Sequence, residues 1–244
     1  MQTLRDVLAH VWDNALRPTK PGEGDGMRVG GSCELPLHHG SIHALRRLAV
    51  YPPGAPQPAP LNGTVMWGPP DRDQRCRVCG YARETLPHVL CHCMMHSAIS
   101  LSRHNAVVSP LRTAAAHDYT VAFEKRPVGD TGLRPDLVLV RGEEALVIDV
   151  ACPFENTPEA FTNTPNDKLA RYQPVTDYLR RRYQKVTVAA AIVGALGAWD
   201  PANNRVLLCL CSRSYLRLMK KLCVSEVVAA SRAIYHAHVG HGRS

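Results

Sequence analysis

The sequence predicts an α/β fold from about residue 97 onward, because helical and strand patterns alternate along that part of the chain. The helical patterns have apolar residues spaced three or four apart, whereas the strand patterns are short runs of β-branched and other apolar residues. Helices are expected over 96–116, 167–184 and 205–237, a strand-turn-strand unit over 134–151, and a further strand over 186–193. Such an alternation is typical of one domain in which helices pack against a sheet.

The first 65 residues are expected to be a linker with one or two short helices. Helical patterns occur over 1–17 and 41–50, and proline- and glycine-rich segments follow each of them. Proline lacks a backbone donor and fixes φ, so these segments do not continue either helix. The first 18 residues are amphipathic and carry charges at Arg5 and Asp6, which is not the pattern of a signal peptide.

The chain combines an excess of positive charge with short apolar runs. Its 244 residues are enough for one substantial hydrophobic core or two small ones. The formal net charge of +8 suits a polyanionic partner, of which nucleic acid is the commonest. The longest apolar run, over 186–196, is about half the length that a membrane-spanning helix needs. No membrane partner is therefore expected.

Four of the nine cysteines lie between Cys76 and Cys93, which favours metal binding over disulfides and indicates a reducing compartment. Three of them and His88 form the spacing C-x2-C-x8-H-x4-C, with Cys76, Cys79, His88 and Cys93 as the ligands. A CxxC turn lets two thiolates converge on one ion, and Gly80 lets the chain double back. Thiolates in a closed set of four ligands favour a structural Zn2+ ion.

Other assignments are open for this segment. Either Cys91 or His96 can replace one of the last two ligands, or the cysteines are simply buried thiols. A unit this small cannot fold by apolar burial alone, so bound zinc would supply its folding free energy. The surrounding arginines suit either phosphate contact or simple solvation; they are Arg72, Arg75, Arg77 and Arg83.

The segment RPDLVLVRGEEALVIDVACPFE, over 134–155, places two aspartates at matching positions of a predicted hairpin. Pairing the strands around the polar turn puts Val140 opposite Ala145, and the same register puts Asp136 opposite Asp149. Directly paired residues point to the same face of an antiparallel ladder, with Cβ atoms about 5 Å apart. Like charges so close are costly unless a positive group lies between them. We therefore expect a divalent cation with oxygen preference, Mg2+ or Mn2+.

The alternative is that the two aspartates are structural. Asp136 follows Pro135, as a strand-end residue can. Asp149 is harder to explain in that way, because it interrupts the apolar strand LVIDVAC, and a buried carboxylate needs a partner. A divalent cation there would suit the binding of a scissile phosphate, the activation of a water and the stabilisation of a leaving oxygen.

Phosphodiester cleavage also needs a positive group near the attacking water or the transition state. Lys168 is the best candidate, because it follows a helix cap at Asn166 or Asp167. Tyr172 is four residues further on and is expected on the same helical face. Pro174 is expected to kink this helix or to start a new one. Without the aspartate pair, Lys168 is an ordinary surface lysine.

The order of these motifs resembles a known family. A CCHC knuckle is followed by Arg103-His104-Asn105, RPD at 134–136, the strand aspartate, the lysine–tyrosine helix and the turn GALGAWDP at 194–201. This order resembles the C-terminal region of non-long-terminal-repeat retrotransposon polyproteins that carry a restriction-like endonuclease, the group typified by elements that insert into ribosomal RNA genes. The resemblance extends over roughly residues 66–240.

The resemblance implies the PD-(D/E)xK nuclease fold, a mixed sheet flanked by helices. It divides the chain into a CCHC zinc knuckle over 66–96 and a restriction-like endonuclease domain over 97–244. The general nuclease pattern has lysine where this chain has Ala151, but in the nucleases that it resembles the lysine comes from the next helix, as Lys168 does. Asp136, Asp149 and Lys168 are then the implied catalytic residues, with Tyr172 accessory.

The function so implied is metal-dependent nicking of double-stranded target DNA in the nucleus. The freed 3′ end would prime reverse transcription of the element's RNA, by a polymerase whose YxDD aspartate pair does not occur in this sequence. The alternative is a catalytically inactive remnant that still binds nucleic acid. A purely structural protein leaves Asp149 unexplained. His104 suits contact with the metal site or with a phosphate, and equally a helix-capping or buried hydrogen-bonding role.

Overall fold

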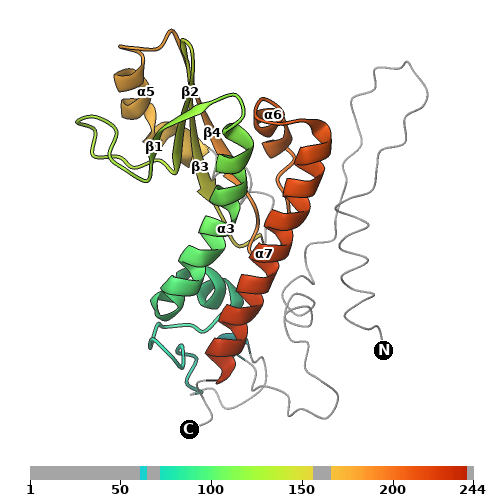
Figure 1. Cartoon of the computed structure of the whole chain (residues 1–244). Helices are drawn as coiled ribbons and strands as arrows, with labels where there is room; N and C mark the ends of the chain where they lie inside the picture. The colour runs from blue at the N-terminus through green and yellow to red at the C-terminus, as the bar shows by residue number, and fades with distance from the viewer. Residues whose placement is uncertain (1–60, 65–71, 156–165, 241–244) are drawn as a thin grey trace, which may run out of the picture.

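The computed structural model describes residues 61–64, 72–155 and 166–240, and the predicted helices at 1–17 and 41–50 lie outside these ranges. The described residues form a four-stranded mixed sheet flanked by helices (Figure 1), which confirms the expected α/β class. The strands, in sheet order, are β1 (Thr120–Glu124), β2 (Leu137–Arg141), β3 (Glu144–Ala151) and β4 (Lys185–Ile192). The first three pair antiparallel, and β4 runs parallel to β3.

Helices cover both faces of this sheet. The short ones are the 3-10 turns η2 (Asn62–Thr64) and η4 (Met94–His96) and the π-helix η3 (His88–His92). The longer ones are α3 (Ser97–Ala115), α5 (Gln173–Leu179), α6 (Asn203–Leu207) and α7 (Arg213–Gly240), and residues 166–171 are also helical. Helices α3, α6 and α7 lie on one face of the sheet, and α5 lies on the other (Figure 1).

The structure departs from the sequence prediction in three places. Strand β1 was missed, because it is a short edge strand of five residues whose burial does not alternate. The helix expected over 167–184 is broken at Tyr172, and α5 begins at Gln173 with Pro174 in its first turn, where proline costs no hydrogen bond. The helix expected over 205–237 is divided into α6 and α7 by a turn at 208–212.

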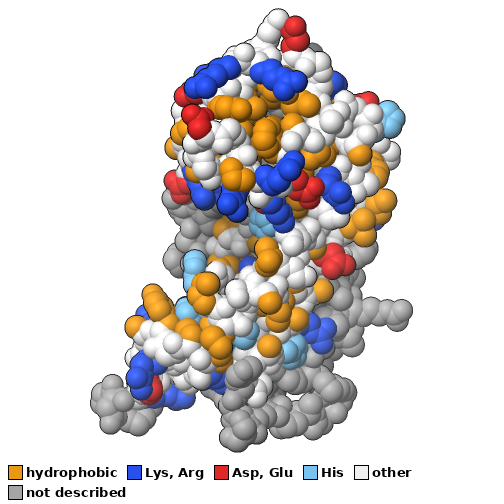
Figure 2. Space-filling view, turned by 60° about the vertical axis from the view of Figure 1, so that its left-hand side comes forward, with side chains coloured by type: hydrophobic (Ala, Val, Ile, Leu, Met, Phe, Trp, Pro, Cys, Tyr) orange, Lys and Arg blue, Asp and Glu red, His pale blue; other side chains and the backbone are white. Residues whose placement is uncertain are grey.

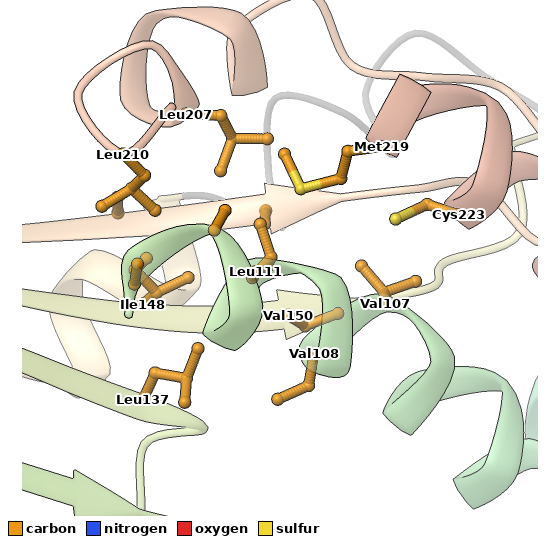
Figure 3. Packing of buried hydrophobic residues seen from close by; sticks show 14 of the residues in the cluster. Val107, Val108, Leu111, Leu137, Ile148, Val150, Leu207, Leu210, Met219 and Cys223 are labelled. Carbon is orange, nitrogen blue, oxygen red and sulfur yellow. The ribbon is translucent and has the colours of Figure 1, made fainter. Parts of the chain in front are cut away.

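Successive residues of the central strands point to opposite faces of the sheet, and each face has its own apolar cluster. Figure 3 shows Val107, Val108 and Leu111 of α3 packed over the sheet residues Leu137, Ile148 and Val150, with Leu207, Leu210, Met219 and Cys223 closing the cluster. On the opposite face, Val138 and Val147 pack against Val175 and Leu179 of α5. Side chains alternate between the two faces of a strand, and helices cover both faces of this sheet. The central strands are therefore apolar at successive positions.

Helices α3 and α7 are longer than the sheet and run side by side beyond it (Figure 1). Their far ends contact the knuckle segment, defined here as residues 72–96, which includes η3 and η4. The sheet and the knuckle segment are thus packed on the same pair of helices. Within the described ranges, no helix has the length and apolarity needed to cross a membrane.

Replacing Leu111 with alanine should lower the free energy of unfolding by about 2–5 kcal/mol, because it removes a fully buried side chain from the main core. Leu101 lies on the same helix and is 58% exposed, so Leu101→Ala should cost less than about 0.5 kcal/mol. Urea unfolding of both variants measures the difference. Equal losses would contradict the placement of α3.

Candidate metal centres

The four cysteine and histidine ligands expected from the sequence come together in the structure. Cys76, Cys79, His88 and Cys93 each offer one donor atom, and these atoms all lie within 4.8 Å of one another. Sγ of Cys79 is 3.3 Å from Nε2 of His88, near the separation of roughly 3.5 Å between ligands of a tetrahedral zinc ion. Three of the four residues are buried. The donor set and its spacing fit zinc, so this cluster could hold a zinc ion.

Local turns bring these ligands together. Gly80 N donates to Cys76 O at 2.9 Å, and Gly80 has a φ of 74°, which lets the chain reverse directly after the CxxC. His88 begins the π-helix η3, and Cys93 follows its last residue and donates its N–H to His88 O at 2.7 Å. The exposed ring of Tyr81 stacks on His88 with the centroids 4.5 Å apart, which holds the imidazole in place.

The two alternative ligands lie in different surroundings. Sγ of Cys91 points to the backbone oxygen of Cys152 at 3.7 Å and belongs to none of the ligand groups found among the described residues. Nε2 of His96 lies 3.0 Å from Nδ1 of His238, and both rings approach Cys93 as a second, three-residue group. His96 therefore adjoins the candidate zinc cluster, whereas Cys91 belongs to no such group.

A buried hydrogen-bond network joins the knuckle segment to the end of α7. Glu84 and His238 are both 0% exposed, and His238 Nε2 lies 2.8 Å from Glu84 Oε1 and 4.0 Å from Cys76 Sγ. The second oxygen of Glu84 accepts from Arg77 Nη2 at 2.8 Å and from Asn62 N at 2.6 Å. One carboxylate therefore holds three segments of the chain that are distant in sequence.

These hydrogen-bond partners keep the carboxyl group of Glu84 ionised. Burial by itself would raise the pKa of Glu84, but the hydrogen bonds from His238, Arg77 and two backbone N–H groups hold that pKa well below its ordinary value. A buried carboxylate that loses one partner is left uncompensated, which is strongly destabilising. Sequence reasoning did not identify Glu84 or His238, although Glu84 is the only acidic residue between Cys76 and Cys93.

The arginines of the knuckle segment divide into two groups. Two of them form ion pairs within the protein. Arg77 pairs with the buried Glu84, and Nη2 of Arg75 lies 2.9 Å from Oδ2 of Asp73. Arg72 and Arg83 are exposed. The phosphate contact weighed for all four from the sequence therefore does not apply to Arg77, whose guanidinium packs against a buried carboxylate.

Strands β2 and β3 pair in the register that the sequence predicted. Val140 lies opposite Ala145, and the ladder ends one pair before Asp136 and Asp149. Both aspartates are buried, with 7% and 4% of their surface exposed. The hairpin therefore carries two buried carboxylates at neighbouring positions, one on each strand.

Asp136 is hydrogen-bonded to both the sheet and α3. Its Oδ2 accepts from Val150 N at 2.7 Å and lies 3.1 Å from His104 Nε2. Burial alone would raise the pKa of Asp136, but these two hydrogen bonds and the charges of His104 and Lys125 hold it below its ordinary value. The contact with Asp136 raises the pKa of His104 despite burial. Oδ1 of Asp136 accepts no hydrogen bond from the described residues, so it is available as a ligand.

Asp149 is held by the helical segment that precedes α5. Lys168 Nζ donates to Oδ2 of Asp149, and Tyr172 OH donates to Oδ1 at 2.7 Å. Burial and the hydrogen bond to Asp149 raise the pKa of Tyr172, so the phenol keeps its proton and remains a donor. A lysine therefore reaches this carboxylate from the helix, while Ala151 occupies the end of β3.

Arg103 and His104 are consecutive residues of α3 that contact different parts of the molecule. Arg103 is 4% exposed, and its guanidinium donates to Leu90 O at 3.0 Å and to Ser231 Oγ at 2.9 Å. The next residue, His104, contacts Asp136. One turn of α3 thus connects the knuckle segment, α7 and the aspartate pair. The contact of His104 with a site carboxylate is one of the roles that the sequence had left open.

Comparison with known proteins gives one informative relative. The chain is 34% identical over 144 residues to a protein described as "Retrovirus-related Pol polyprotein from type-1 retrotransposable element R2" from Popillia japonica. It is similar to part of a retrotransposon polyprotein. The match includes 56% of this chain and only 30% of that polyprotein, so the chain spans less than a third of its relative's length. No family model matches the chain.

The purified protein should contain about one zinc ion per chain, because one closed set of four ligands is present. Cys76→Ser should abolish this zinc and lower the thermal unfolding midpoint, since metal binding contributes to folding. Cys209→Ser removes an exposed thiol from the turn after α6 and should change neither quantity. Elemental analysis and thermal unfolding measure both, and zinc retained in Cys76→Ser would contradict the assignment.

Glu84→Gln should lower the free energy of unfolding by about 3 kcal/mol, because it removes the negative charge that His238 and Arg77 share. Glu226→Gln changes an exposed glutamate on α7 and should have almost no effect. Urea unfolding of the zinc-bound chain measures both variants. A Glu84→Gln protein as stable as wild type would show that the buried carboxylate is dispensable.

Proposed function

We propose that this chain is the endonuclease part of a retrotransposon polyprotein and cuts DNA with the help of a divalent cation. The observation that carries the proposal is the pair of buried aspartates on β2 and β3, with Lys168 bonded to Asp149 from the following helix. This geometry matches the resemblance seen in the sequence, in which the lysine comes from the helix and not from position 151. The similarity to a retrotransposon polyprotein supports the same origin.

The proposed fold is that of the PD-(D/E)xK nucleases, with Asp136, Asp149 and Lys168 as the catalytic residues and Tyr172 accessory. Carboxylate oxygens of the two aspartates are the ligands that Mg2+ or Mn2+ prefers. When bound there, the ion would polarise a phosphate and activate a water. Lys168 then neutralises charge at Asp149, and Tyr172 fixes the rotation of that carboxylate by donating to Oδ1.

The proposed substrate is double-stranded target DNA, nicked in the nucleus so that the 3′ end primes reverse transcription of element RNA. Lys and Arg side chains gather over the half of the molecule that contains the sheet and α5 (Figure 2). Exposed members next to α5 are Arg171, Arg180, Arg181 and Arg182. Such a surface neutralises phosphates and releases counterions on binding. We assign residues 66–96 to a zinc knuckle that supports nucleic-acid binding and residues 97–244 to the nuclease domain.

A second candidate function is nucleic-acid binding without cleavage. One observation favours it: each aspartate already has a basic side chain, His104 beside Asp136 and Lys168 beside Asp149. These contacts can compensate the buried charges in the absence of a cation. In this case the site would be a stabilised remnant, and the aspartates would contribute to folding only.

The zinc-bound chain should nick supercoiled plasmid in Mg2+ or Mn2+, and Asp149→Ala should reduce the rate at least about 100-fold, since it removes a proposed ligand. Asp177→Ala replaces an exposed aspartate on α5 and should leave the rate unchanged. The ratio of nicked to supercoiled plasmid over time measures both. If wild type nicks no faster than Asp149→Ala, the endonuclease proposal fails and the binding function stands.

A further inference from the structure

Lys125 lies at the aspartate pair in an unusual backbone conformation. It directly follows β1 and has a φ of 50°, and it is the only non-glycine residue with positive φ among the described parts of the chain. Its N–H donates to Pro135 O at 3.1 Å and to Asp136 O at 3.3 Å. The backbone of Lys125 is therefore fastened to the residue that carries one of the two site carboxylates.

The positive φ of Lys125 is a strained conformation for a residue with a side chain. Left-handed φ values suit glycine and asparagine, and a lysine there loses stability that glycine would keep. Such outliers persist where the surrounding structure enforces them, and they concentrate at functional sites. The backbone conformation at this turn favours glycine and gives no reason for lysine. We therefore look for the reason in the contacts of the lysine side chain.

The side chain of Lys125 reaches α3 next to the site. Its Nζ donates to Oδ1 of Asn105, the residue after His104, and His104 contacts Asp136. Lys125 thus lies beside Asp136 through its backbone and through Asn105 and His104, whereas Lys168 donates directly to Asp149.

We infer that Lys125 binds a DNA phosphate beside the aspartate pair. The inference rests on the proposed function, because it assigns a second phosphate contact to the same site. The Lys125 ammonium contacts Asn105 and neither site carboxylate, so it can contact a phosphate next to the site while the two carboxylates hold a cation. An ammonium on a flexible stem suits contact with a phosphodiester, which carries one negative charge per nucleotide.

Lys125→Gly separates this role from a structural one. Glycine removes the cation and also relieves the positive φ, so the thermal midpoint should equal or exceed that of wild type. Affinity for a 30-base-pair duplex, measured in Ca2+ over a range of salt, should fall, and the slope of log affinity against log salt should drop by about 1. Plasmid nicking should fall about 10-fold, in proportion to the lost contact.

Two controls define the result. Lys125→Arg keeps the charge and should retain affinity and salt slope. Lys185→Ala removes an exposed lysine beside Glu144, at the hairpin-turn end of β3 and away from Asp149, and should change neither. Unchanged affinity and slope in Lys125→Gly would overturn the inference, as would an equal loss in Lys125→Arg. If wild type binds the duplex but does not nick, the proposed function fails while the affinity and salt slope still decide on Lys125.

Discussion

A shift of one residue in the pairing of β2 with β3 would turn every side chain of the shifted strand to the opposite face of the sheet. With β2 in place, Ile148 of β3 would leave the interior that it fills together with Leu139 beneath α3, so the apolar core fixes the register. Asp136 and Asp149 lie one pair beyond the ladder and inherit that register. Apolar packing therefore places two carboxylates together that would repel one another in isolation. The backbone N–H of Val150, bonded to Asp136, fastens the arrangement.

Three separate elements each place a basic side chain near the aspartate pair. His104 comes from α3, Lys168 from the helical segment before α5, and Lys125 from the end of β1. The site thus depends on the whole sheet and its helices being in place. The same α3 turn reaches the knuckle segment through Arg103, and α7 reaches it through His238. The knuckle segment, which could hold a zinc ion, and the aspartate pair are therefore connected by buried contacts.

Sequence patterns were sufficient where the relevant interactions are local. The spacing of Cys76 to Cys93, the hairpin register, and the four-residue separation of Lys168 from Tyr172 all depend on short-range geometry, and the structure brings these residues together. Contacts between distant segments could not be predicted. Glu84 and His238 are 154 residues apart, and no local periodicity relates them.

The edge strand and the turns could also not be predicted from the sequence. Strand β1 is short and half exposed, so it lacks the alternation that marks a strand with one buried face. Without β1 there was no reason to place Lys125 near Asp136, because that proximity is created by the pairing of β1 with β2. The break between α6 and α7 is similar, since helix-compatible residues continue through the turn at 208–212, where α6 packs on β4 and α7 begins.

The most direct test of the account is Mn2+ binding to the zinc-loaded chain, measured by titration with electron paramagnetic resonance. Wild type should bind Mn2+, and Asp149→Asn and Asp136→Asn should each weaken this binding at least about 10-fold, because each removes the charge of a proposed oxygen ligand with almost no change in side-chain volume. Asp177→Asn, on the exposed face of α5, should bind as wild type does. Equal Mn2+ affinity in all four proteins would contradict a cation site at the aspartate pair.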